Sequence, residues 1–141
     1  MKKQLGFTMI ELMIVIIIIG ILATLGGAAY SKSLQKGRDT KRISDMQEIQ
    51  KGFEMYYAAN TPNEYGAPCS TMFVPKYFPA GIPTPPVGAP IYKGSCNSGS
   101  YFYCTGLERP TDFGNAIYDG NVTMSFVDKS SATHYCVQNV Q

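Results

Sequence analysis

An apolar run near the start of the chain is the strongest pattern in the sequence. It begins at Phe7, is interrupted by Thr8 and Glu11, and continues from Leu12 to Tyr30 as 19 residues without a charge. A helix needs about 20 such residues to cross a bilayer core of about 30 Å. The run therefore predicts that residues 7–31 form the membrane-spanning first half of a long N-terminal helix.

A second helical pattern follows directly, over residues 32–60. Apolar side chains recur there at spacings of three or four, which predicts the amphipathic half of the same helix; they are Ile43, Met46, Ile49, Phe53 and either Tyr56 or Tyr57. Lys41 and Asp45 are four residues apart and are expected to pair on the polar side. Pro62 disfavours helix in the residue before it, so the helix is expected to end at Asn60-Thr61-Pro62.

Residues 61–141 predict an extracytoplasmic globular domain. Its first part, residues 62–90, holds eight of the nine prolines and indicates an irregular loop, in which residues 74–79 are expected to pin against the helix. Strand-like runs follow at residues 101–105, 114–118, 122–127 and 133–137. The pattern predicts an α+β fold in which the long helix packs on a small antiparallel sheet.

Two details of this sheet are predicted from local pattern. Asp119-Gly120 between two strand-like runs is a signal for a type I′ hairpin. Val122, Met124 and Phe126 alternate with polar residues and form one apolar face. We expect that face to lie on the apolar stripe of the helix.

Four cysteines all follow the apolar run, without a Cys-x-x-Cys pair and with a single histidine, so no metal site and no cofactor are expected. Two disulfides in an extracytoplasmic domain fit better. Three pairings are open. Because Cys104 and Cys136 each fall in a predicted strand, we favour Cys104–Cys136 together with Cys69–Cys96.

The charge and the remaining motifs of the sequence exclude classes of function and do not indicate one. The net charge of +2 does not by itself indicate nucleic acid as a partner. The sequence holds no nucleophile motif or phosphate-binding loop, so an enzyme is not expected, and His134 is interpreted as structural or exposed. Oxygen-bearing side chains between residues 112 and 128 lack the spacing of an EF-hand and are interpreted as turn formers.

Glu11 is the unusual residue of the apolar run. A carboxylate deep in a membrane costs at least about 2.5–3.5 kcal/mol, although one near the helix N-terminus also meets the positive end of the dipole. The order Gly6-Phe7-Thr8-Met9-Ile10-Glu11-Leu12, preceded by a basic segment, resembles the motif of type IV prepilins and type II secretion pseudopilins. The apolar residues 13–23 resemble that family too, and the resemblance covers about the first 60 residues.

The resemblance implies a role for several residues. Residues 1–6 would be a leader that a prepilin peptidase removes after Gly6, and Phe7 would become the N-methylated N-terminus. Glu11 would pair with the Phe7 amine of a neighbouring subunit and set the axial register of the packed helices. Many relatives have a proline where this chain has Ala28. Local flexibility is therefore expected at Gly20, Gly26 and Gly27, with close helix packing at these small residues as the open alternative.

The resemblance also implies a function. The chain would be a pilin: a homo-oligomeric subunit of a helical filament, made as a single-pass precursor in the inner (cytoplasmic) membrane and moved by an inner-membrane assembly platform to an extracellular pilus. Such filaments serve adhesion, twitching motility or DNA uptake. Two alternatives stay open, a type II secretion pseudopilin and an unprocessed single-span membrane protein with a small extracytoplasmic binding domain.

The basic residues complicate the orientation. More of them follow Tyr30 than precede Phe7, which by the positive-inside rule favours a cytoplasmic C-terminal part. The cysteines and the family resemblance favour the opposite orientation, and we adopt that one.

Overall fold

A computed structural model describes residues 6–86, 91–118 and 124–140, without the side chains of residues 25, 26 and 28. The chain divides into two compact units, Met1–Gln35 and Lys36–Gln141. Helix α1 (Met9–Ala59) contributes residues to both units. It ends immediately before Asn60-Thr61-Pro62, as the proline predicts.

The described part of the first unit consists of residues 6–8 and the first part of helix α1. Helix α1 is apolar and long enough to cross a membrane, with a mean hydropathy of 2.7 in its most apolar window, and none of that window is buried within the chain. The apolar pattern therefore builds a helix without an intramolecular core.

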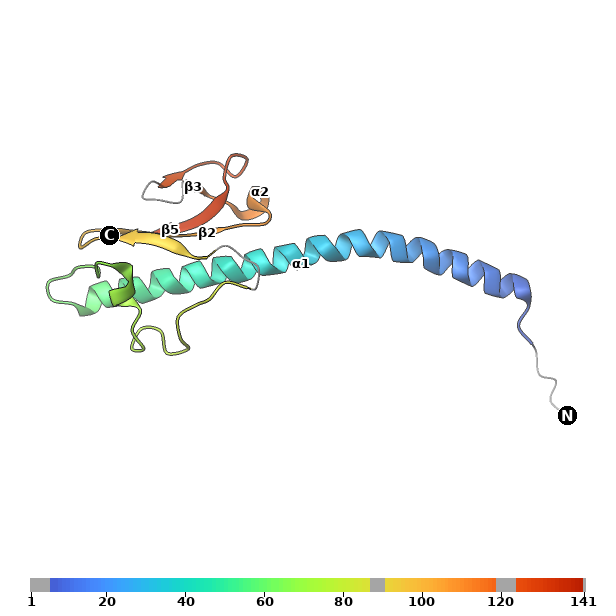
Figure 1. Cartoon of the computed structure of the whole chain (residues 1–141), viewed down its shortest axis with the longest axis horizontal. Helices are drawn as coiled ribbons and strands as arrows, with labels where there is room; N and C mark the ends of the chain where they lie inside the picture. Colours follow the sequence, from blue (N-terminus) through green and yellow to red (C-terminus); the bar gives the residue numbers. More distant parts are fainter. Residues whose placement is uncertain (1–5, 87–90, 119–123, 141) are drawn as a thin grey trace. The chain divides into compact units, whose positions relative to one another are not determined.

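The second unit contains an antiparallel sheet of five strands beside its part of α1 (Figure 1). The strands lie in the order β1-β2-β5-β3-β4. They are β1 (Lys93–Cys96), β2 (Tyr101–Gly106), β3 (Ala116–Tyr118), β4 (Met124–Phe126) and β5 (His134–Gln138). A 3-10 helix, η1 (Cys69–Met72), and a short helix, α2 (Pro110–Phe113), complete the unit. The predicted α+β class is confirmed.

Strand β1 was not predicted, because Gly94 and Ser95 have low strand propensity. It forms because β2 supplies an aromatic cover: a Cβ atom on Gly94 would lie only 2.2 Å from the ring of Tyr103, its cross-strand partner. The other four strands overlap the predicted runs. The predicted hairpin at Asp119-Gly120 lies outside the described residues, although β3 and β4 do pair antiparallel.

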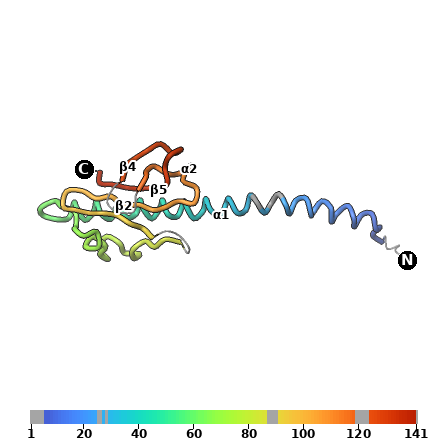
Figure 2. Tube along the Cα trace, turned by 45° about the horizontal axis from the view of Figure 1, so that its top comes forward, coloured from blue at the N-terminus to red at the C-terminus, as the bar shows by residue number. Residues whose placement is uncertain are grey.

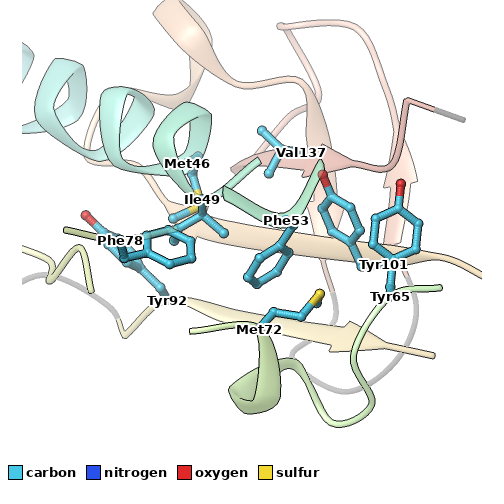
Figure 3. Close-up of a cluster of buried hydrophobic side chains, with 9 residues drawn as sticks. All are labelled: Met46, Ile49, Phe53, Tyr65, Met72, Phe78, Tyr92, Tyr101 and Val137. Carbon is cyan, nitrogen blue, oxygen red and sulfur yellow. The ribbon is translucent and has the colours of Figure 1, made fainter. Parts of the chain in front are cut away.

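The core of the second unit forms on the predicted stripe of α1. Met46, Ile49 and Phe53 are fully buried. The ring of Phe53 makes edge contacts with Phe73 and Tyr101, each at a centroid distance of 5.0 Å. Such aromatic pairs add about 0.5–1.5 kcal/mol each beyond the burial of their area. Figure 3 shows the cluster, which joins the helix, the sheet and the segment that holds Met72 and Phe78.

The two faces of the sheet have different roles. Tyr101 and Tyr103 of β2 and Val137 of β5 pack toward α1, whereas Cys104, Cys136 and Ala116 form a second cluster. This division follows the alternation of side chains along a strand. Met124 packs on that second cluster and Phe126 is 47% exposed. The expectation that their face lies on the helix is therefore wrong, because β2 and β5 already cover the stripe.

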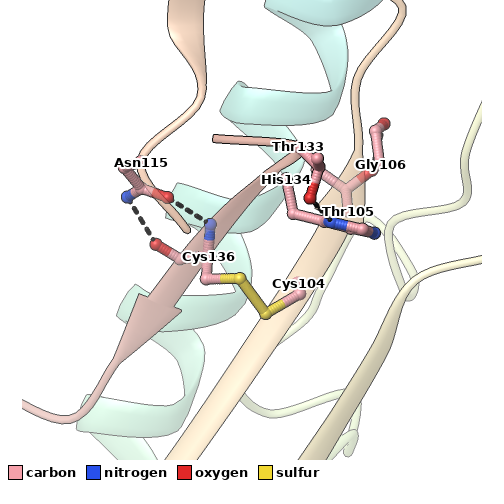
Figure 4. Close-up of a disulfide and its surroundings, with 7 residues drawn as sticks. All are labelled: Cys104, Thr105, Gly106, Asn115, Thr133, His134 and Cys136. Atoms are coloured by element: carbon pink, nitrogen blue, oxygen red, sulfur yellow. Dashed lines mark hydrogen bonds between the residues drawn. A yellow bond between two sulfur atoms is a disulfide. The ribbon is translucent and has the colours of Figure 1, made fainter. Parts of the chain in front are cut away.

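Both disulfides join the pairs favoured from the sequence, Cys69–Cys96 and Cys104–Cys136. Cys104 and Cys136 are direct partners across β2 and β5 and are almost fully buried (Figure 4). Cys69 precedes this sheet in η1 and bonds to the end of β1. The Cys69–Cys96 disulfide therefore links the proline-rich segment to the sheet.

The proline-rich segment runs back along α1 after the helix ends (Figure 2). Phe78 is 2% exposed, and its ring lies directly over Gly52 of the helix. The expectation that residues 74–79 pin this segment against the helix is confirmed at Phe78. Gly52 is required there because its missing side chain leaves the space that the ring fills.

Candidate processing and assembly site

Helix α1 begins at a reciprocal pair formed by Thr8 and Glu11. The backbone N–H and the hydroxyl of Thr8 donate to Glu11 Oε2 at 3.0 and 2.8 Å, and the backbone N–H of Glu11 donates to Thr8 Oγ1 at 3.3 Å. This is a capping box, which satisfies amides that the first helical turn leaves without partners. The Thr-x-x-Glu spacing is the sequence signal for such a cap, and the apolar pattern alone does not reveal it.

Glu11 keeps bonding capacity beyond this cap. Both hydrogen bonds that it accepts from Thr8 reach Oε2, and no donor in the described part of the chain reaches Oε1. No cationic group among the described residues pairs with it. Gly6 and Phe7 are exposed, Phe7 by 83%, whereas Lys2 and Lys3 lie outside the described residues. The geometry can therefore accommodate a donor from another chain at Oε1 while the cap stays in place.

The surface that surrounds this site is apolar and uncovered. From Met9 to Leu22, the large apolar side chains have exposures from 44% at Val15 to 79% at Met9. A contiguous exposed apolar surface of this kind is typical of a contact with lipid or with other protein. Around Gly20 and Gly27, no atom would meet an added Cβ within 4 Å. These glycines and Gly26 lie in continuous helix, and their flexibility stays a prediction.

A buried ion cluster occupies the first turns of α1 in the second unit. Asp39 is fully buried and Arg42 is 1% exposed. Arg42 donates to Asp39 Oδ1 at 2.5 Å and to Glu108 Oε1 at 2.8 Å. Asp39 also accepts the backbone N–H groups of Glu108 and Arg109 at 3.0 and 2.8 Å. Buried charges of this kind persist only where they are paired and hydrogen-bonded.

This cluster ties the connection between β2 and α2 to the helix, and no local pattern in the sequence indicates it. Asp39 and Arg42 are three residues apart, a spacing at which helical side chains meet. The spacing does not show that both are buried, because the covering residues, Glu108 and Arg109, are about 70 positions away in the chain.

Two further basic residues on α1 also have acidic partners. Arg38 binds Glu108 at 2.6 Å, and Lys41 binds Asp45 at 2.5 Å. The hydrogen bond from Arg38, assisted by Arg42, lowers the pKa of Glu108 from 4.5 to about 2.

Asp45 differs from its predicted position. The expectation that it lies on the polar side is wrong, because it is fully buried and accepts a hydrogen bond from the hydroxyl of Tyr92 at 2.6 Å. Burial, assisted by this bond to Asp45, raises the pKa of Tyr92.

The other polar residues considered from the sequence have structural contacts. His134 lies in β5, its Nδ1 is 2.8 Å from the hydroxyl of Thr133, and burial lowers its pKa. The Asn115 side chain exchanges two hydrogen bonds with the backbone of Cys136, at 2.9 and 2.8 Å (Figure 4). Within residues 6–86, 91–118 and 124–140, no three His, Cys, Asp or Glu side chains form a group that could hold a metal ion.

The following matches to known proteins each cover less than half of the chain. Residues 1–27 match the model of the prokaryotic N-terminal methylation motif. The type II secretion system core protein G of Escherichia coli (strain K12) is 38% identical over 41% of this chain and 40% of its own length. Fimbrial protein Q of Moraxella bovis is 48% identical over 33% of this chain and 29% of its own length. A fimbrial protein of Pseudomonas aeruginosa is 41% identical over 38% and 35% respectively.

The chain therefore spans about two fifths of the length of the first curated relatives that it matches. The search of solved structures found no match. The methylation motif and these relatives make the chain similar to type IV pilins and pseudopilins, and the α+β fold on a long apolar helix agrees with the fold that this resemblance implies.

Proposed function

We propose that this chain is a structural subunit of a type IV pilus. A prepilin peptidase cleaves the precursor between Gly6 and Phe7, and Phe7 is then N-methylated. The mature subunits pack through the apolar half of α1 into a helical filament outside the cell. Such a filament serves adhesion, twitching motility or DNA uptake.

The observation that carries this proposal is the environment of Glu11. Its carboxylate stands at the start of a helix with an uncovered apolar surface, and none of the described residues offers it a cation. Glu11 is exposed in the single chain. Packing of the helices in a filament would bury its carboxylate, which then needs a cationic partner. The N-methylated amine of Phe7 from a neighbouring copy keeps its positive charge and fits this need. Oε1 accepts it, and the cap on Oε2 remains.

The first experiment is the mass of the protein isolated from its native membrane. The proposal expects a chain that begins at N-methyl-Phe7. A chain that retains residues 1–6 would instead favour an unprocessed single-span membrane protein.

Substitutions separate pairing from capping. Glu11→Val is expected to abolish filament assembly, because it removes the partner of the amine. Thr8→Val is the matched control: it removes the capping hydroxyl, a loss of about 0.5–2 kcal/mol to the helix, and leaves the carboxylate. Assembly is expected to persist in this control. If Glu11→Val filaments form normally, the pairing role is wrong.

A pseudopilus subunit of a type II secretion system is the second candidate. The names of the core protein G relatives favour it, and their matches span 58 and 59 residues of this chain. The two disulfides favour a domain that works outside the cytoplasm in either case. Filaments sheared from the cell surface that contain this chain would support the pilus. A secretion defect on deletion without such filaments would support the pseudopilus.

A further inference from the structure

The basic residues that follow the apolar run do not all have the same partners. Five of them lie between residues 32 and 42: Lys32, Lys36, Arg38, Lys41 and Arg42. Arg38, Lys41 and Arg42 form ion pairs with Glu108, Asp45 and Asp39, all within the second unit. Their charges are thus largely neutralised by the globular unit.

Two lysines remain, and their surroundings differ. The Nζ atom of Lys36 lies 6.0 Å from the centre of the Phe113 ring, a cation–π distance, so the second unit provides a partner for it. Lys32 is exposed and belongs to the first unit, and no carboxylate or aromatic ring among the described residues of that unit contacts it. Of the five cations, Lys32 is the one without an anionic or aromatic partner among the described residues of its own unit.

The position of Lys32 determines which anion is near. It follows the uncharged run by two residues, and Tyr30, which is 67% exposed, ends that run. Tyrosine is enriched at the level of the lipid headgroups, and a lysine at the end of a membrane helix extends its ammonium group to the same level. In a membrane-anchored chain, the phosphates of anionic lipids are therefore the nearest acceptors for this charge.

We infer that Lys32 binds the headgroup phosphate of an anionic phospholipid while the subunit resides in the membrane, with Tyr30 placing the helix at that depth. This inference rests on the membrane stage of the proposed function. Extraction of a subunit into a filament then requires this contact to be given up. The lipid composition would consequently set part of the barrier to assembly.

The chain contains no tryptophan, which allows a single probe. Tyr30→Trp keeps an aromatic ring at the headgroup level and places a fluorophore two residues from Lys32. The full chain with this probe is reconstituted in mixed phosphatidylcholine and phosphatidylglycerol vesicles. In one preparation the phosphatidylcholine carries bromine on its acyl chains, and in the other the phosphatidylglycerol does. The ratio of tryptophan quenching in the two preparations reports which lipid lies next to the helix.

At low salt, we expect phosphatidylglycerol to be enriched about fivefold beside the probe, since each basic residue near the surface contributes about 1 kcal/mol. Enrichment should fall as salt screens the contact. Lys32→Gln should abolish it, and Lys32→Arg should retain it. Lys51→Gln, an exposed lysine farther along α1, is the matched control and should leave it unchanged.

An enrichment that survives Lys32→Gln, or equal quenching by both lipids in the parent chain, would overturn the inference while leaving the filament proposal intact. A probe that neither brominated lipid quenches would show that the chain does not insert. That result would overturn the membrane stage of the proposed function as well.

Discussion

Gly52 and Gly37 offer a matched pair of substitutions with effects of opposite sign. Both lie within α1 in the second unit, and replacement of glycine by alanine in a helix interior stabilises it by about 1 kcal/mol. Around Gly37, nothing would meet the added Cβ within 4 Å. At Gly52, the new Cβ would lie 2.2 Å from Cζ of Phe78 and 2.7 Å from both Cε atoms.

The magnitude at Gly52 follows from what Phe78 would lose. Carbon atoms at rest approach to about 3.5–4.0 Å, so the ring must move by more than 1 Å, roughly, out of a site where it is 2% exposed. Full burial of the Phe78 ring is worth about 1.5–3 kcal/mol. Its contacts with Phe53 and Phe73 are worth about 0.5–1.5 kcal/mol each. Partial loss of the burial and of these contacts gives a cost of about 3 kcal/mol. After the helix gain, Gly52→Ala should destabilise the second unit by about 2 kcal/mol.

Urea unfolding of the detergent-solubilised chain measures both effects. The near-ultraviolet circular dichroism of the ten tyrosines reports the core, since tryptophan is absent. Gly37→Ala should raise the free energy of unfolding by about 1 kcal/mol. Gly52→Ala combined with Phe78→Leu should recover part of the loss, because the smaller side chain leaves room for Cβ. If Gly52→Ala is as stable as the parent chain, the packing of Phe78 on α1 is wrong.

Three further predictions concern the polar and covalent links of the second unit. Arg42→Met should cost about 3–5 kcal/mol in urea unfolding because it leaves a buried carboxylate unpaired. Arg38 is only partly buried, so Arg38→Met should cost less than about 1 kcal/mol; equal losses would contradict the role of burial. Because the pKa of Glu108 is lowered from 4.5 to about 2, its pairing should stabilise the fold fully above pH 4.5 and be lost as the pH falls toward 2. The loss should be about 1–2 kcal/mol after allowance for solvent screening, and a Glu108→Gln variant that keeps the same acid dependence would refute this. A mild reductant should open the half-buried Cys69–Cys96 disulfide before the buried one that joins β2 and β5; alkylation and mass spectrometry give the order, and simultaneous opening would contradict it.

Local pattern determined much of this molecule. The uncharged run predicts the apolar half of α1, and the spacing of Met46, Ile49 and Phe53 predicts the buried face of its second half. Pro62 predicts the end of the helix. The motif from Gly6 to Glu11 carries the family resemblance on which the processing and assembly roles are proposed. Each of these signals is carried by residues that are close together in the chain, so periodicity and spacing are enough to detect it.

Only the tertiary structure decided which face of the sheet meets the helix and which charged residues of α1 are buried. The apolar alternation around Met124 was read as a core face, but β2 and β5 cover the helix instead. Asp45 is expected on the polar side, and no pattern indicates that Asp39 and Arg42 are buried, because the partners Glu108 and Tyr92 are distant in sequence. The periodicity of a segment indicates which of its side chains share one face of the helix. Whether another segment covers it depends on contacts between residues far apart in the chain, and the pattern of a single segment does not contain them.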